Sequence, residues 1–176
     1  QIREELMTDR YEKYTKFEFD RPVERVLRIT LNNPKTYNSL DAVGHNQLTS
    51  IWRDLDEDPD ISAVILTGKG KAFSSGGDFG MIEATMKEET ARLQAWKEAR
   101  DLVYNLINCN KPIVSAINGV AVGAGLVAAL LADISIAGKA AKIVDGHTRL
   151  GVAAGDCAVI NWPLLCGMAK AKYLLL

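Results

Sequence analysis

Hydrophobic and polar residues alternate with a period of two near the start of the chain, which predicts two neighbouring strands. Phe17 to Asp20 and Val26 to Leu31 follow this pattern around a turn region at Asp20 to Val23, and we expect them to form a hairpin. The apolar spacing then becomes helical. Ser39 or Asp41 is suited to cap this helix. Its apolar positions are Val43, Leu48, Ile51, Trp52 and Leu55.

The middle of the chain alternates apolar runs with helical patterns. The runs Ile61 to Thr67, Ile113 to Ile117 and Ile134 to Ala137 predict strands buried in a sheet, and Lys142 to Val144 follows the last of them. One polar helix is expected from Glu83 to Ile107. Repeated strand–helix alternation indicates an α/β layer structure with right-handed crossovers. The predicted inner face of the polar helix consists of Leu93, Trp96, Ala99, Leu102, Val103 and Leu106.

Two glycine-dense turns each follow a predicted strand. The first is Lys71 to Asp78, with the sequence KAFSSGGD, and the second is Asn118 to Gly125, with the sequence NGVAVGAG. Backbone N–H groups can converge in such turns, and two convergent donors are what an enzyme needs to hold a developing oxyanion. The second turn opens into the small-residue helix pattern Leu126 to Ala132. Its amides are therefore expected at a helix N-terminus, which favours negative charge.

Composition narrows the class of protein. At 176 residues and 48% hydrophobic, the chain suits one globular domain, which we expect at residues 15–176 after a polar lead-in at 1–14. A net charge of -1 gives no reason to expect nucleic acid or an anionic membrane as a partner. The three cysteines lack metal-ligand spacing and are odd in number, so we expect no metal site and a reducing compartment, the cytoplasm by default.

The two ends of the chain suggest further expectations. The N-terminal residues are charged and lack the apolar stretch of a signal peptide, and no apolar stretch is long enough to span a bilayer. The last residues, Ala169 to Leu176, form a helical pattern without a stop signal. We expect that the natural chain continues or that its remainder is missing here.

Several motifs occur in the order and spacing of the crotonase (enoyl-CoA hydratase/isomerase) superfamily, which the chain resembles over roughly residues 15–176. These motifs are Lys71 to Asp78, Lys111 to Gly119, Ala132 to Ile134 and Leu150-Gly151. The segment Asn32 to Asp41 is similar to the N-terminal substrate-binding segment of that family.

The resemblance implies an α/β crotonase-like spiral core of ββα units, with the C-terminal helical region missing or truncated. It implies an acyl-CoA thioester substrate held by the backbone N–H groups of Gly77 and Ala124, with coenzyme A entering only as part of the substrate. It also implies homotrimers, or hexamers built as dimers of trimers. The implied substrate or coenzyme A contacts are Tyr37, Ser39, Ser75, Asp78, Phe79, Val122, Gly123 and Gly146.

The chain departs from the hydratases at the two positions where they carry catalytic acids, which align with Val127 and His147. A valine cannot transfer a proton, so hydration by a carboxylate pair is excluded by that route. The segment from Asp145 to Asp156 is similar to that of β-diketone hydrolases of the 6-oxocamphor hydrolase type. There a histidine and an aspartate nine residues later activate water, and His147 and Asp156 have that spacing. The segment does not by itself fix the substrate.

Each candidate residue also has a structural interpretation. His147 suits a general base because its pKa lies near neutrality. Asp156 is suited to orient that imidazole or to cap the following helix, and the two roles are compatible. For Asp78 we favour a helix cap. Glu83 and His45 are expected on solvated helix surfaces.

Three functions remain open at this stage. The first is an acyl-CoA enzyme of the hydratase/isomerase family that uses His147 as its base. The second is a hydrolase that cleaves a carbon–carbon bond of a β-diketone. The third is a non-catalytic acyl-CoA binder, against which the His147 and Asp156 pair argues.

Overall fold

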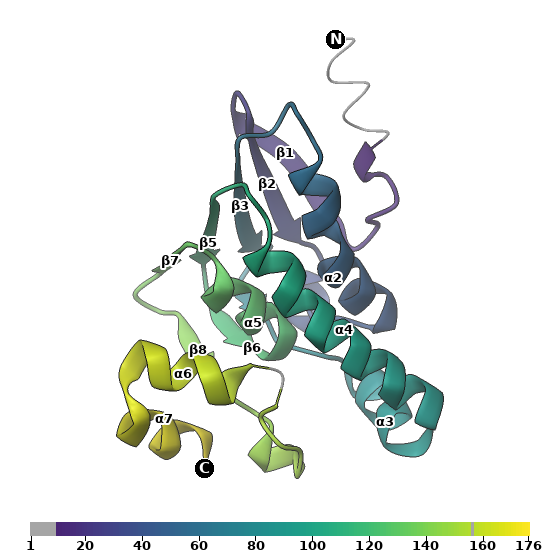
Figure 1. The fold of residues 1–176 in the computed structure, drawn as a ribbon, viewed down its shortest axis with the longest axis vertical. Helices are drawn as coiled ribbons and strands as arrows, with labels where there is room; N and C mark the ends of the chain where they lie inside the picture. Colours follow the sequence, from purple (N-terminus) through teal and green to yellow (C-terminus); the bar gives the residue numbers. More distant parts are fainter. Residues whose placement is uncertain (1–9, 156) are drawn as a thin grey trace.

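Strands and helices alternate along the computed structural model, which describes residues 10–155 and 157–176 (Figure 1). The strands are β1 (Phe17–Val23), β2 (Val26–Leu31), β3 (Ala63–Gly68), β4 (Ala72–Ser74), β5 (Ile113–Ile117), β6 (Val120–Val122), β7 (Ile134–Ala137) and β8 (Lys142–Val144). The helices are α2 (Ala42–Asp56), α3 (Phe79–Lys87), α4 (Glu89–Ile107), α5 (Gly123–Leu131), α6 (Ala158–Cys166) and α7 (Met168–Leu175), with 3₁₀ turns η1 (Pro34–Thr36) and η2 (Thr148–Leu150).

The larger sheet has the strand order β1-β2-β3-β5-β7. β1 and β2 form the predicted antiparallel hairpin, in which Phe17 lies opposite Leu31. The pairs β2–β3, β3–β5 and β5–β7 are parallel. Parallel neighbours require crossover connections, which helices supply here, so the predicted α/β class is confirmed.

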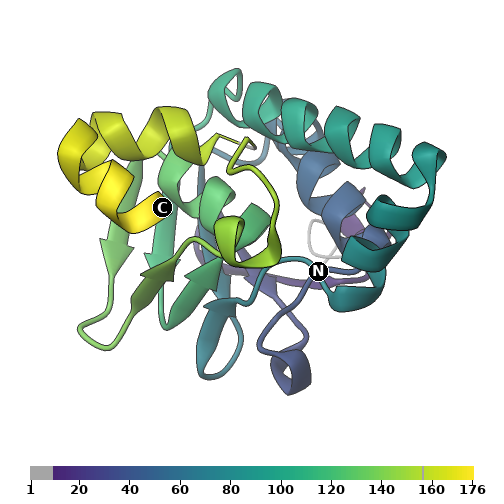
Figure 2. The same cartoon turned by 90° about the horizontal axis from the view of Figure 1, so that it is seen from below.

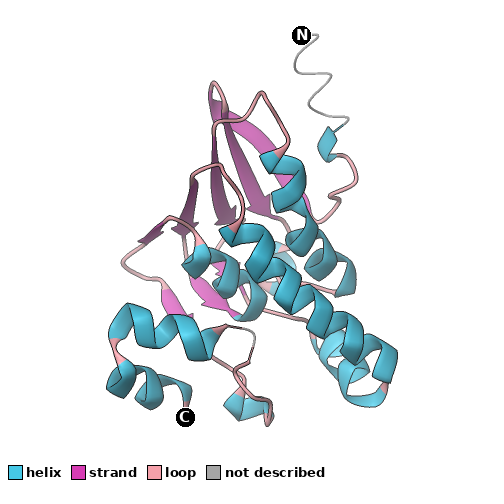
Figure 3. Ribbon diagram, viewed as in Figure 1, coloured by secondary structure: helices cyan, strands magenta, loops and turns pink. Residues whose placement is uncertain are grey.

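A smaller parallel sheet has the order β4-β6-β8. Each of its strands follows directly on a strand of the larger sheet: β3 leads to β4, β5 to β6 and β7 to β8. A helical segment then follows each strand pair. The chain therefore repeats a ββα unit, which confirms the crotonase-like core. Figure 3 distinguishes the strands of both sheets, in magenta, from the helices, in cyan.

The main core lies between the larger sheet and the helices, which lie over the strands in Figure 2. Asp41 begins α2 as predicted, because its carboxylate accepts a hydrogen bond of 2.8 Å from the Gly44 N–H. Four of the predicted apolar positions on α2 are fully buried, whereas Val43 is exposed. The buried positions are Leu48, Ile51, Trp52 and Leu55.

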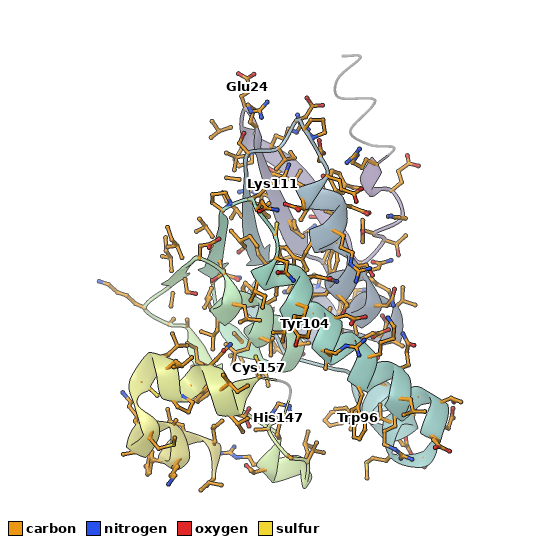
Figure 4. The ribbon with its side chains drawn as sticks, viewed as in Figure 1. Glu24, Trp96, Tyr104, Lys111, His147 and Cys157 are labelled. Atoms are coloured by element: carbon orange, nitrogen blue, oxygen red, sulfur yellow. The ribbon has the colours of Figure 1, made fainter. Side chains whose placement is uncertain are left out.

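The predicted helix from Glu83 to Ile107 is instead two helices. Glu88 adopts an extended backbone between α3 and α4. The predicted inner face is wrong at its N-terminal end, because Leu93 is 54% and Trp96 is 71% exposed. Figure 4 shows Trp96 projecting from this end of α4. The side chains of α4 that are buried are Glu98, Leu102 and Leu106, spaced one turn apart where α4 packs against α2.

Two further expectations need correction. The strands are not all covered on both faces: β7 exposes all four of its residues, because it is the edge of the larger sheet. β3 alternates between buried and half-buried positions. His45, expected on a solvated surface, is only 7% exposed. It lies where α2 meets α4, with its imidazole Nδ1 2.6 Å from a Glu98 carboxylate oxygen.

The helices α6 and α7 pack against each other at the C-terminal end of the chain. Trp162 and Leu175 are buried, whereas Leu164, Leu165 and Leu176 are exposed. Apolar side chains are therefore exposed on both of these helices and at the last residue. No helix within residues 10–155 and 157–176 combines the length and apolarity needed to cross a membrane.

Candidate active site

The candidate site lies at the carboxyl ends of the three strands of the smaller sheet. Because β4, β6 and β8 are parallel, the segments that follow them emerge at the same edge. Val122, the last residue of β6, lies opposite Val144, the last residue of β8. A Cβ built on Gly146 would lie 3.9 Å from the Val122 side chain. The sheet therefore brings together three stretches of chain that are far apart in sequence.

The two glycine turns pack directly against each other. Gly76 and Gly123 have positive φ values of 86° and 56°, which side chains other than glycine adopt only with strain. A Cβ on Gly123 would lie 3.1 Å from the Gly76 Cα and 3.7 Å from the Gly77 nitrogen. Glycine is thus needed at Gly123 both for its conformation and for the close approach of the two turns.

The backbone N–H of Gly77 points away from the neighbouring chain segment. Leu40 donates its N–H to the Gly76 carbonyl at 2.8 Å, and Asp78 donates its N–H to the Leu40 carbonyl at 2.9 Å. Successive amides alternate in direction along an extended chain, so the intervening Gly77 N–H faces the opposite side. That N–H donates no hydrogen bond to any residue that the structure describes.

The N–H of Ala124 occupies the second position of α5. The first four amides of an α-helix have no partner inside the helix, and the helix dipole favours negative charge at this end. Within residues 10–155 and 157–176, nothing accepts a hydrogen bond from this amide. Gly77 and Ala124 thus present two backbone donors, on turns that pack against each other, to which no described residue is an acceptor.

The segment before α2 lies alongside the first glycine turn. The Ser75 N–H donates to the Tyr37 carbonyl at 2.9 Å, and the Ser75 hydroxyl donates to the Thr36 carbonyl at 2.9 Å. Buried Asn38 links this segment to β4, because its side-chain amide donates hydrogen bonds to the carbonyls of Ala72 and Phe73. Sequence reasoning missed Asn38, although asparagine is among the residues that tolerate its left-handed backbone, φ 59°.

The structure assigns different surroundings to the other predicted contact residues. Asp78 caps α3, as favoured, by accepting the Met81 N–H at 2.7 Å. Phe79 is 81% exposed. Ser39 donates to the Thr36 hydroxyl and faces a small cavity beside α2, which does not include His147. Tyr37, Ser75 and Asp78 are therefore grouped at the first turn, and Ser39 is not grouped with His147.

A second small cavity, of about 10 Å³, lies between α5, α6 and the loop after β8. This volume is close to the minimum that a single water molecule occupies. Val127 and His147, the two positions that carry acids in hydratases, both line it. Figure 4 shows His147 on the loop near Cys157 at the start of α6. The complete lining is Gly123, Leu126, Val127, Leu130, Asp145, His147, Cys157, Ala158, Asn161 and Trp162.

The imidazole of His147 is held by a carboxylate that sequence reasoning did not select. An Asp145 oxygen lies 2.8 Å from His147 Nδ1, and the other oxygen accepts the His147 backbone N–H at 3.1 Å. Asp156, the predicted partner, lies outside the described residues. The available signal for Asp145 was its place two residues before a histidine at the end of a strand.

The ββα units and the paired sheets define a crotonase-like protein. The family model for enoyl-CoA hydratase/isomerase matches residues 22–176. The chain belongs to this family, which confirms its resemblance to the crotonase superfamily.

Solved structures of family members superpose closely on this chain. An enoyl-CoA hydratase/isomerase from Mycobacterium paratuberculosis matches with a TM-score of 0.86 at 34% identity, covering 92% of this chain and 64% of that one. The crystal structure of a putative enoyl-CoA hydratase from Streptomyces coelicolor matches with a TM-score of 0.85 at 30% identity, covering 93% of this chain and 60% of that one.

The names of similar proteins refer to more than one reaction. The 1,2-epoxyphenylacetyl-CoA isomerase of Escherichia coli is 34% identical over 86% of this chain and 58% of its own length. A probable peroxisomal enoyl-CoA hydratase of Arabidopsis thaliana is 37% identical over 70% of this chain and 45% of its own length. The chain therefore spans roughly half the length of these relatives.

Proposed function

We propose that this chain is the core of an acyl-CoA-processing enzyme, in which the Gly77 and Ala124 N–H groups bind the thioester oxygen. The observation that carries the proposal is the pair of available amides on adjacent turns, next to the cavity that His147 lines. Negative charge develops on this oxygen when a thioester forms an enolate or a tetrahedral intermediate. Two fixed donors stabilise that charge more strongly than the neutral carbonyl of the ground state.

His147 acts as the general base in this proposal, and Asp156 supports it. The imidazole lines the same cavity as Val127, which has no proton to exchange. A neutral imidazole can remove a proton from the substrate carbon next to the thioester or from a water molecule. The proposed contacts of the substrate or its coenzyme A portion are Tyr37, Ser39, Ser75, Asp78, Phe79, Val122, Gly123 and Gly146.

Ligand binding by the full-length protein tests the substrate class. Calorimetry compares a series of CoA thioesters with free β-diketones of similar acyl size. We expect binding of the thioesters and of free coenzyme A. Binding of the diketones without any affinity for coenzyme A would contradict the proposal.

The oxyanion donors are tested by Ala124→Pro. Proline removes the N–H but fits the first turn of a helix, where that N–H has no helical partner. We expect kcat to fall on the order of 10²–10³, the usual effect of losing one oxyanion donor. Ala124→Ser retains the N–H and serves as the matched control. Equal turnover of the proline and serine variants would exclude Ala124 as a donor.

A second candidate function is cleavage of a carbon–carbon bond in a β-diketone. The presence of Val127 and His147 in place of acids favours it. His147 would take a proton from water as the hydroxyl adds to one carbonyl carbon, whose oxygen the two amides bind. The carbon–carbon bond then breaks, and the imidazolium returns its proton to the leaving carbon.

A third candidate, an acyl-CoA binder without activity, predicts tight thioester binding with no turnover.

The assembly and compartment are also part of the proposal. We propose a homotrimer or a hexamer of paired trimers, supported by the exposed apolar side chains of Leu164, Leu165 and Leu176. Sedimentation as a monomer at micromolar concentration would contradict it.

The proposed location is the cytoplasm. Fractionation of the source cells that recovers the protein in an organelle would overturn this assignment.

A further inference from the structure

The carboxylate of Asp145 directs both of its oxygens at one residue. Oδ1 accepts the backbone N–H of His147 at 3.1 Å, and Oδ2 lies 2.8 Å from His147 Nδ1. The Asp145 side chain is only 4% exposed, whereas that of His147 is 21% exposed. The nearly buried Asp145 carboxylate thus contacts the partly exposed His147 at two atoms, the backbone nitrogen and the ring Nδ1.

The contact selects which ring nitrogen is basic. A carboxylate only accepts hydrogen bonds, so Nδ1 carries the hydrogen in the Asp145 contact. A neutral imidazole has one N–H, which leaves Nε2 as its basic atom. We propose that Asp145 is the positioning residue of His147, which fixes its ring orientation and its tautomer with Nε2 as the base. This inference rests on the proposed function of His147.

The surroundings of the pair strengthen the interaction. From α5 the cavity is lined by apolar side chains, those of Leu126, Val127 and Leu130. From α6 it is lined by Cys157, Asn161 and Trp162, together with Ala158. Among the residues that the structure describes, Asp145 is the only carboxylate in this lining, and Cys157 is the only other titratable group besides His147. A charge pair in such apolar surroundings interacts more strongly than in water.

The proposal predicts which imidazole nitrogen of neutral His147 carries the hydrogen in the unmodified protein. NMR of the full chain labelled with ¹⁵N distinguishes the two neutral tautomers of an imidazole. The chain contains only two histidines, and a His147→Gln variant assigns their signals. We expect the hydrogen of neutral His147 on Nδ1. A hydrogen on Nε2 would overturn the proposal. The tautomer itself is measured on the unmodified protein, and the variant serves only to assign the signals.

The variant Asp145→Asn then measures the electrostatic effect. Asparagine has nearly the same shape and keeps an oxygen for the His147 N–H, so the loop retains its backbone contact. Loss of the negative charge makes the imidazolium less stable, and the pKa of His147 should fall by about 1 unit. Asp60→Asn changes the same charge in an exposed turn and should leave the His147 titration unchanged. An unchanged titration in Asp145→Asn would overturn the proposal.

A parallel variant, Asp156→Asn, separates the two candidate partners. A fall in the His147 pKa in this variant alone would assign the positioning role to Asp156 and overturn the proposal for Asp145. None of these titrations needs substrate. Absence of turnover on every thioester would therefore count against the proposed function, while the tautomer and titration results would still decide the role of Asp145.

Once a substrate is found, kinetics provide a second readout. In Asp145→Asn the acid limb of kcat/KM should move to lower pH, because the base loses its proton at lower pH. The plateau of kcat should fall, since the imidazole is less well oriented. A residue that acted only on folding would lower the amount of active protein and leave the position of the acid limb unchanged.

Discussion

The chain has two histidines, and each lies against a carboxylate. His45 faces Glu98 between α2 and α4, where both side chains are less than a tenth exposed. The other oxygen of Glu98 accepts hydrogen bonds from the side-chain amides of Asn46 and Gln94. His147 faces Asp145 at the edge of the smaller sheet, beside a cavity and the two glycine turns.

The comparison separates a structural pair from a candidate catalytic pair. The imidazole–carboxylate contacts are nearly the same length, 2.6 Å and 2.8 Å. Their positions differ, because His45 is enclosed by two packed helices, whereas the His147 side chain is 21% exposed and lines a small cavity. An imidazole–carboxylate contact therefore does not by itself indicate a functional site. The position of such a contact at the carboxyl ends of parallel strands does indicate one.

Replacing His147 should have the largest effect on activity. In His147→Ala we expect kcat to fall on the order of 10²–10⁴ with substrate binding nearly unchanged, since this is the usual contribution of a general base. Asp156→Asn should cost less, because it would disturb orientation without removing the base. Steady-state kinetics measure both. Turnover like that of the wild type in His147→Ala would show that the base lies elsewhere.

Replacing Glu98 should instead affect stability. Glu98→Ala leaves the buried His45 and the exposed Asn46 and Gln94 without their shared acceptor. Because the buried His45 loses its partner, we expect the free energy of unfolding to fall by about 3 kcal/mol. Glu98→Gln keeps an acceptor oxygen and should lose less. Urea denaturation measures both variants. A drop in kcat of folded Glu98→Gln as large as that of His147→Ala would erase the distinction between the two pairs.

The buried pair should also give stability a particular dependence on pH. Burial raises the pKa of the Glu98 carboxyl, but hydrogen bonds from His45, Gln94 and Asn46 outweigh it and hold the pKa below its ordinary value. A carboxyl whose pKa is lower in the folded state stabilises the fold above the unfolded pKa, and this stability is lost as pH falls through the folded pKa. Urea midpoints below pH 5 should therefore fall less steeply in Glu98→Gln. Parallel pH profiles would contradict this assignment.

The smallest effect is expected from Val127→Glu. This substitution places a carboxyl opposite His147 in the same cavity, but the second acid of a hydratase is still missing. Hydration of a trans-2-enoyl-CoA substrate, followed by loss of absorbance, should remain near its starting level. Efficient hydration by this single variant would show that His147 substitutes for the missing acid, and that the chain is one residue away from a hydratase.

Local features of the fold followed directly from the sequence. The period-two pattern predicted the hairpin of β1 and β2, and Asp41 and Asp78 cap helices as their residue types suggest. These features depend on neighbours a few residues apart, so a linear pattern contains them. The helix break at Glu88 was missed, because no glycine or proline marks it. The outward position of Trp96 was missed because its apolar character indicated burial.

The sequence by itself determined the family, the two glycine turns and the unusual residues Val127 and His147. Only the tertiary structure decided that His45 is buried against Glu98, and that Asp145 contacts Nδ1 of His147. It also brought Gly77, Ala124 and the loop after β8 to one sheet edge. The reason is physical: strand order and helix packing set which residues meet across long sequence separations, and a linear pattern records only local periodicity.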